Sequence, residues 1–159
     1  KHSLKSFLSI NLPIKLEIPT LEEYLIICKD MKIIPQIEIK NGSKEKLQEI
    51  LDLLQKYELK ENAIIISFKG EMIKKVRELD EKIELWYLVE EITEENIKIS
   101  KDNNYKLAFN HKKNDEEVIK KAIGQGLTLC AWTVDDLTVL EELYNLGVKF
   151  ITTNAITPQ

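Results

Sequence analysis

The stretch Thr20-Leu-Glu-Glu-Tyr-Leu-Ile-Ile-Cys28 is soon followed by Ile33-Ile-Pro-Gln-Ile-Glu-Ile39, and the period of the apolar residues changes between the two. The first stretch has helical spacing, and Thr20 with Glu23 three residues later has the pattern of a capping box. The second alternates with period two, which predicts a strand. A helix followed by a strand suggests the repeating unit of a parallel α/β fold.

The same alternation continues to the end of the chain. No linker or low-complexity stretch interrupts it, so we expect a single domain over residues 1–159, with an irregular lead-in at 1–18 that contains Pro13 and Pro19. Asn114 is the expected cap of one helix. The predicted helices are 20–28, 43–59, 71–79, 93–100, 114–123 and 136–146, and the predicted strands are 33–39, 63–68, 83–89, 106–110, 127–133 and 148–153.

Two parallel architectures fit six such strands. A doubly wound nucleotide-binding sheet usually has a Gly-rich turn after its first strand, and this chain has five glycines with no GxGxxG or Walker pattern. A barrel carries polar residues at the C-terminal end of strand after strand. That pattern is present, and the residues are Glu38 and Lys40, Ser67, Glu90, Asn110 and His111, Trp132 and Thr133, and Thr153 and Asn154. The sequence therefore favours an incomplete (β/α)8 TIM-type barrel of six parallel strands with helices.

Composition excludes several functional classes. Hydrophobic residues make up 43% and charged residues 31%, the balance of a soluble globular protein. The net charge of −4 argues against a nucleic-acid partner, and no apolar run reaches the ~18 residues of a membrane span. The two cysteines, Cys28 and Cys130, lie in apolar runs and are expected to be buried free thiols. The cysteines do not decide the cellular compartment, although they slightly favour the cytoplasm. The sequence does not predict the oligomeric state.

Glu38 and Lys40 are the first candidates for chemistry. They share one strand parity with Gln36, whereas Ile37 and Ile39 share the other, so the two sets face opposite sides of the sheet. If the isoleucines pack on helices, Glu38 and Lys40 face the barrel mouth. A carboxylate there can ligate Mg²⁺ or Ca²⁺, and an ammonium can meet a phosphate. An internal Glu–Lys ion pair explains the same spacing equally well.

Other strand-end residues are less specific. Trp132 can wall a substrate pocket, although an isolated aromatic is more often part of a core. Asn110 and Asn154 fit helix caps better than ligand contacts. The only histidines, His2 and His111, have no partner at a recognisable spacing.

Seven short motifs occur in a fixed order along the chain. They are Ile18-Pro-Thr-Leu-Glu-Glu-Tyr-Leu25, Ile37-Glu-Ile-Lys40, Ile65-Ile-Ser-Phe68, Val76-Arg-Glu-Leu79, Tyr87-Leu-Val89, Ala131-Trp-Thr-Val134 and Thr152-Thr-Asn154. Together they resemble the glycerophosphodiester phosphodiesterase family, from about residue 3 to the end of the chain.

The resemblance implies a (β/α)8 barrel of lipid metabolism that hydrolyses a small-molecule glycerophosphodiester to glycerol 3-phosphate and an alcohol with Mg²⁺ or Ca²⁺. By the same resemblance, Glu38 matches the metal-ligand glutamate, Lys40 the phosphate-contacting lysine and Trp132 the tryptophan of the substrate pocket. Trp86 stands where the family often has Gly, and if it points inward it narrows the pocket.

The family's His-Arg-Gly, Glu-x-Asp and later His-Asp segments do not occur in this sequence. The chain also does not begin with Met. We therefore expect a processed or partial chain that lacks the first two βα units, contains no catalytic residue and is inactive alone. Two alternatives remain: a degenerate barrel used for binding or assembly, and a related barrel phospholipase that cleaves by cyclisation, which the quoted words fit less well.

Overall fold

The computed structural model describes residues 18–157 as helices alternating with parallel strands. The lead-in predicted for residues 1–18 lies outside the described residues except for Ile18, and the single-domain assignment stays a prediction. The elements are α2 (Leu21–Met31), β1 (Gln36–Glu38), α3 (Lys44–Lys56), β2 (Ile64–Ser67), α4 (Gly70–Leu79), β3 (Glu84–Val89), α5 (Glu94–Asp102), β4 (Lys106–Asn110), η1 (His111–Lys113), α6 (Glu116–Gly124), β5 (Leu129–Trp132), α7 (Leu137–Leu146) and β6 (Phe150–Ile151).

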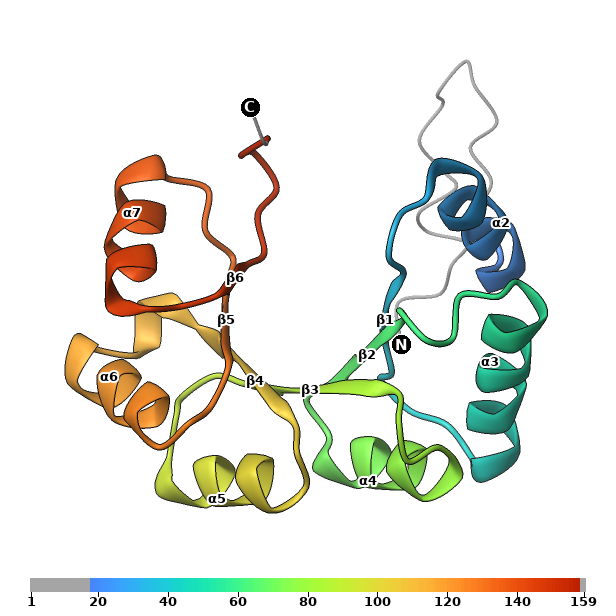
Figure 1. The fold of residues 1–159 in the computed structure, drawn as a ribbon, viewed down its shortest axis with the longest axis horizontal. Coiled ribbons are helices and arrows are strands. Elements are labelled where there is room, and N and C mark those ends of the chain that lie inside the picture. Colours follow the sequence, from blue (N-terminus) through green and yellow to red (C-terminus); the bar gives the residue numbers. More distant parts are fainter. Residues whose placement is uncertain (1–17, 158–159) are drawn as a thin grey trace, which may run out of the picture.

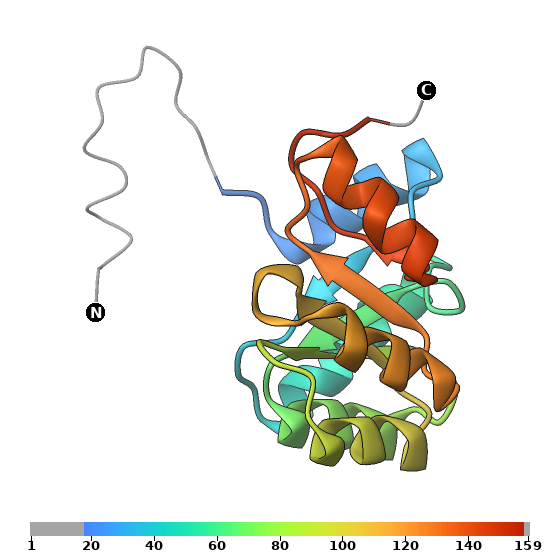
Figure 2. The same ribbon diagram turned by 90° about the vertical axis from the view of Figure 1, so that its left-hand side faces the viewer.

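The strands form one curled sheet with the order β1-β2-β3-β4-β5-β6, and every neighbouring pair is parallel. The helices follow the outside of the curve, and the sheet leaves an opening between its β1 and β6 ends (Figure 1). The turned view places α7 and β5 toward the viewer, at the β6 end (Figure 2). The predicted fold class, an incomplete (β/α)8 barrel, is confirmed.

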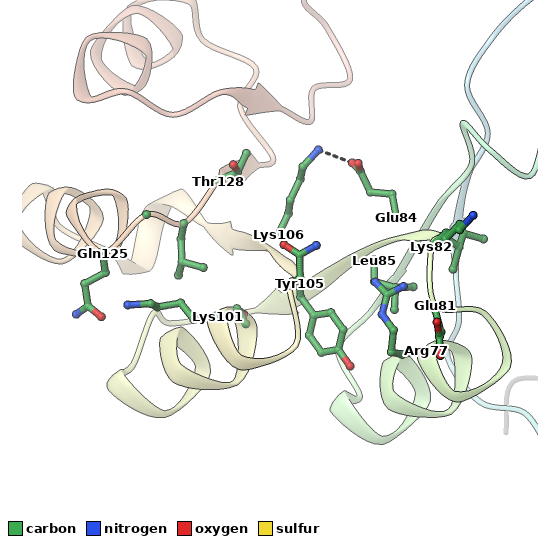
Figure 3. Close-up of a pocket in the computed structure, with 15 residues that line it drawn as sticks. Arg77, Glu81, Lys82, Glu84, Leu85, Lys101, Tyr105, Lys106, Gln125 and Thr128 are labelled. Carbon is green, nitrogen blue, oxygen red and sulfur yellow. Dashed lines mark hydrogen bonds and ion pairs between the residues drawn. The ribbon is translucent and has the colours of Figure 1, made fainter.

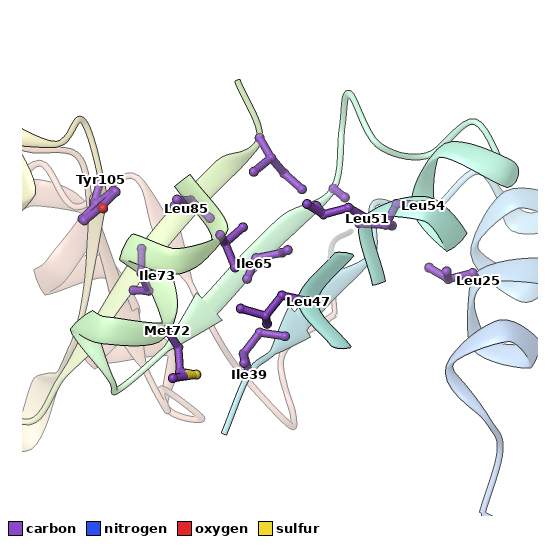
Figure 4. Packing of buried hydrophobic residues seen from close by; sticks show 13 residues of the cluster. Leu25, Ile39, Leu47, Leu51, Leu54, Ile65, Met72, Ile73, Leu85 and Tyr105 are labelled. Atoms are coloured by element: carbon purple, nitrogen blue, oxygen red, sulfur yellow. The ribbon is translucent and has the colours of Figure 1, made fainter. Parts of the chain in front are cut away.

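Alternate residues of each strand face opposite sides of the sheet, as the period of two requires. The outward row packs under the helices. In the half nearer the N-terminus, Ile39, Ile65 and Leu85 meet Leu51 and Ile73 in one buried cluster (Figure 4). Burying a side chain of this size contributes about 1.5–3 kcal/mol, so this row holds the helices on the sheet.

A second outward cluster covers the other half of the sheet and includes Leu107, Phe109 and Leu129. The inward row forms a smaller cluster of its own, in which Trp86, Leu88, Ala108 and Cys130 are buried, with Trp132 packed against them. The concave face is thus apolar at its centre.

The predicted capping box is present, and the predicted Asn114 cap is not. Thr20 and Glu23 make the predicted capping box at α2. Asn114 was expected to cap the helix that became α6, but this is wrong, because Asp115 is the N-cap and accepts a hydrogen bond from the Val118 amide. The Asn114 side chain is used elsewhere: its Nδ2 donates to the backbone oxygens of Glu90 and Asn110.

The first strand is shorter than predicted. Regular pairing covers Gln36–Glu38 rather than 33–39. The Ile33 amide donates to the Cys28 oxygen as part of the α2 ending, where Lys32 has a left-handed backbone (φ 55°). Residue 35 is a proline, so it has no amide hydrogen to donate to a neighbouring strand, although its backbone oxygen accepts a hydrogen bond from the Ile64 amide.

The sheet has two edges in the described part of the chain. There, β1 pairs with β2 alone, and β6 pairs with β5 alone. Large apolar side chains are exposed near each edge: Ile33 and Ile34 precede β1, and Leu137 and Tyr144 lie on α7. None of the helices in residues 18–157 is long and apolar enough to cross a membrane.

The outward cluster makes a stability prediction. Phe109 is 0% exposed, so Phe109→Ala leaves a cavity and is expected to lower the free energy of unfolding by about 3–5 kcal/mol. Leu137 is 64% exposed, so Leu137→Ala should change it by less than about 0.5 kcal/mol. Urea unfolding followed by circular dichroism measures both. Equal losses in the two variants would contradict the assignment of the outward row as the core.

Candidate active site on the concave face

A cavity of about 220 Å³ lies on the concave face, toward the C-terminal ends of the strands. Its lining comes from all six strands or the residues that follow them, and it is mostly apolar. Glu38 supplies its only carboxylate. The C-terminal face is where barrels of this kind carry their active sites, so this cavity is the candidate site.

Glu38 lies where its strand parity predicted. Its neighbours Ile37 and Ile39 belong to the outward cluster under the helices, whereas Glu38 lines the cavity. Lys40 shares that parity but lies in the turn after β1, is exposed and is not among the lining residues. No salt bridge joins Glu38 to Lys40 in the described structure, so the internal ion pair is not formed.

Trp132, the last residue of β5, reaches the same cavity from the other side. Its ring meets Phe68 edge to face, with centroids 5.6 Å apart and an interplanar angle of 83°. The indole Nε1 is buried and has no hydrogen-bond partner among the described residues. The structure therefore brings Glu38 and Trp132 together around a cavity with an uncommitted donor, and it leaves Lys40 outside the lining.

Trp86 points inward, as the sequence comparison allowed, and it is 3% exposed. Its Nε1 donates to Glu84 Oε1 over 2.6 Å, and that oxygen also lies 2.5 Å from Lys106 Nζ. Trp86 thus occupies the lining on the β3 side and is held by its own hydrogen bond.

Cys130 is the thiol of the lining, and Cys28 lies buried in α2. Both are free, as predicted. Burial raises the pKa of the Cys130 thiol to about 11. A thiol with so high a pKa is protonated at neutral pH and is a poor nucleophile, so Cys130 shapes the cavity without reacting in it.

The remaining strand-end polar residues make structural hydrogen bonds. Buried Ser67 donates to the Ile39 oxygen over 2.6 Å and ties β2 to the end of β1. His111 Nε2 lies 3.0 Å from the Thr133 oxygen, to which it donates. Asp135 accepts from the Asn154 amide and the Thr153 hydroxyl, which together lower the pKa of its carboxyl.

Two lining residues were missed by sequence reasoning. Sequence reasoning gives Phe68 no role, although Phe68 lines the cavity and its ring packs edge to face against that of Trp132. Thr152 lines the cavity from the segment after β6 and lies 3.6 Å from the Cys130 sulfur. The contact of Phe68 with Trp132 is tertiary, and Thr152 follows a strand of only two residues. Neither feature produces a local pattern in the sequence.

A model of the glycerophosphoryl diester phosphodiesterase family matches residues 3–157. The chain belongs to this family. No curated protein matches it.

Solved structures of the family share the fold. A glycerophosphodiester phosphodiesterase from Parabacteroides distasonis is 29% identical with a TM-score of 0.68, over 85% of this chain and 59% of that one. An Oleispira antarctica phosphodiesterase, solved with the product sn-glycerol-3-phosphate, is 18% identical with a TM-score of 0.77, over 86% and 57%. An enzyme from Thermotoga maritima is 22% identical with a TM-score of 0.60, over 86% and 60%. The chain thus spans less than two thirds of each relative.

The family generally uses a divalent metal ion. Residues 18–157 contain no group of three or more His, Cys, Asp or Glu side chains that could hold one. One carboxylate holds Mg²⁺ poorly, because the ion gives up its waters reluctantly. The described residues therefore offer fewer than three such ligands in any one place, and Glu38 is the only carboxylate that lines the cavity.

The hydrogen bonds of Glu90, after the end of β3, lead to a pH-dependent prediction. Glu90 Oε2 accepts from Asn110 Nδ2 over 2.9 Å and lies 3.1 Å from Lys113 Nζ. The Asn110 hydrogen bond, followed by that of Lys113, lowers the pKa of Glu90 below its ordinary 4.5. Asn110→Ala should therefore raise this pKa toward 4.5, as measured by a carbon-detected NMR titration. Lys113→Gln should raise it less.

Because the folded-state pKa of Glu90 is depressed, its contribution to stability is complete above about 4.5 and is lost as the pH falls through the folded-state pKa. Lys120→Gln removes the same charge from an exposed pair with Glu116 on α6 and should leave the pKa of Glu90 unchanged. An unmoved pKa in Asn110→Ala would show that the hydrogen bond is not its cause.

Proposed function

We propose that this chain forms one side of a glycerophosphodiester phosphodiesterase active site, which hydrolyses glycerophosphodiesters to glycerol 3-phosphate and an alcohol. The observation that carries the proposal is the convergence of Glu38 and Trp132, from β1 and β5, on one cavity at the C-terminal ends of the strands. Membership of the family supports the same reaction class.

Each residue has a distinct proposed role. Glu38 contributes one carboxylate oxygen as a ligand to Mg²⁺ or Ca²⁺. Trp132 walls the substrate pocket and offers its unpaired indole N–H to an acceptor on the substrate. Lys40 contacts the phosphate as a point charge, and its exposure in the turn after β1 leaves its ammonium free to move toward an anion.

We further propose that the active enzyme needs two more βα units, which supply the histidines and the other carboxylates. The exposed apolar side chains near β1 and on α7 support this, because added units would cover them. General acid–base catalysis contributes roughly 10²–10⁴-fold and requires such groups. The one histidine in the described chain, His111, is hydrogen-bonded to the Thr133 oxygen and does not line the cavity.

The first test uses the 159-residue chain. With glycerophosphocholine and added Mg²⁺ or Ca²⁺, we expect no release of glycerol 3-phosphate above the buffer rate, because acid, base and most metal ligands are lacking. A coupled enzymatic assay for glycerol 3-phosphate measures it. Turnover that disappears in Glu38→Gln would contradict the inactivity of the isolated chain.

The roles are then tested by fusing two βα units with His-Arg-Gly and Glu-x-Asp segments before Lys1. In an active fusion, Glu38→Gln should lower kcat on the order of 100-fold or more, since it removes charge stabilisation at the reacting centre. Glu61→Gln, an exposed carboxylate before β2, should leave kcat unchanged. Equal kcat values for the two variants would remove Glu38 from the mechanism.

A second candidate is a non-catalytic barrel used for binding or assembly. The lack of a three-ligand metal cluster within residues 18–157 favours it. The retention of Glu38, Lys40 and Trp132 argues against it, since a scaffold has no chemical need for all three. The coding sequence upstream of Lys1 decides: a His-Arg-Gly and Glu-x-Asp region supports the enzyme, and a start codon near Lys1 supports the scaffold.

A further inference from the structure

A second cavity lies at the opposite end of the strands from Glu38 and Trp132. Its volume is about 370 Å³, within the range of small-molecule sites. The connections that lead into β3, β4 and β5 line it, together with the last turns of α4 and α5 and the first residues of β3 and β4. None of its lining residues lines the candidate active site.

The lining is positively charged, although the whole chain carries −4. It contains four basic side chains, Arg77, Lys82, Lys101 and Lys106, against two acidic ones. Figure 3 shows Lys101 on one side of the cavity and Arg77 and Lys82 on the other, with the Lys106–Glu84 pair between them. The local excess of positive charge favours an anion.

Two of the four basic side chains already have a partner within residues 18–157, and two do not. Lys106 Nζ lies 2.5 Å from Glu84 Oε1, and Arg77 donates a hydrogen bond to the backbone oxygen of Asp80 over 3.2 Å. Lys82 and Lys101 are exposed and make no ion pair with another described residue. Two ammonium groups are therefore available to a ligand, one from the connection between α4 and β3 and one from the last turn of α5.

The lining also contains an unpaired buried hydroxyl. Ser100 is 0% exposed, and its Oγ has no hydrogen-bond partner among the described residues. The backbone of Ser100 is satisfied, since its oxygen accepts from the Tyr105 amide at 2.8 Å. A buried hydroxyl without a partner is costly, and a ligand oxygen in the adjoining cavity would remove that cost after a small rotation of the side chain.

From these features we propose that this cavity is a second binding site, which takes a small dianion such as a phosphate monoester. Two charges on the ligand match the two uncommitted lysines, and the volume leaves room for a metabolite-sized group beyond the phosphate. The inference does not depend on the proposed function, because no residue of the candidate active site lines the second cavity.

A physical link joins this site to the other end of the sheet. Lys106 Nζ and Trp86 Nε1 share Glu84 Oε1 as their partner, and Trp86 lines the candidate active site. An anion that draws Lys106 away from Glu84 changes the surroundings of the Trp86 indole. Trp86 is therefore a reporter of binding at the second site.

The test titrates the 159-residue chain with inorganic phosphate and, in a second arm, with ribose 5-phosphate, at constant ionic strength. We expect saturable amide shifts in NMR spectra at Asn104 and Gly126, which line the second cavity, and none at Gly42, in the turn after β1. Tighter binding of ribose 5-phosphate identifies a phosphorylated metabolite as the ligand, and equal binding identifies free phosphate. Shifts at Gly42 alone would overturn the proposal.

Variants distinguish phosphate binding in this cavity from non-specific electrostatic attraction to surface lysines. Lys82→Gln and Lys101→Gln should each weaken phosphate binding about fivefold, and Ser100→Ala should weaken it as well. Lys74→Gln removes the same charge from an exposed position on α4 outside the cavity and should change binding less than twofold. Emission of the Trp132→Phe chain, in which Trp86 is the only tryptophan, should change with the same midpoint. If Lys74→Gln weakens binding as much as Lys82→Gln and Lys101→Gln, no site exists.

Discussion

The alternation of side chains across six parallel strands is the constraint on which the rest of the structure depends. Outward residues such as Ile65, Leu107 and Leu129 are buried under the helices, and their burial holds the layers together. Because the sheet curls, the inward residues converge on the concave face. Any polar or aromatic residue of inward parity near a strand end is therefore brought toward its counterparts on distant strands, as Glu38 and Trp132 are.

This constraint explains which features the sequence predicts. Strand parity requires only local spacing, so it correctly placed Ile37 and Ile39 outward and Glu38 inward. Other features depend on partners far along the chain. The Ile92 amide donates to Asn114 Oδ1 across 22 residues, and this long-range contact displaced the predicted cap by one residue. The edge-to-face contact of Phe68 with Trp132 has the same origin.

The inward row also carries a charged layer that sequence reasoning did not anticipate. Lys106 Nζ lies 4.7 Å from the Phe150 ring centroid and 5.5 Å from that of Trp86, and it pairs with Glu84. Side-chain exposures of 28% for Lys106 and 38% for Glu84 keep the ion pair partly in water, so its energetic value is modest. Its structural consequence is larger, because Glu84 fixes the indole that forms one wall of the candidate active site.

Two buried side-chain donors within residues 18–157 have no hydrogen-bond partner, and they differ in what they imply about ligand binding. The Ser100 hydroxyl can rotate, so a small movement can give it a partner, and its meaning rests on the cationic cavity beside it. The Trp132 indole has one N–H in a fixed direction, and its ring packs edge to face on Phe68. Rotation cannot satisfy that donor without losing the ring contact. An acceptor brought by a ligand can satisfy it, and this is the physical basis of the substrate-binding role that we propose for Trp132.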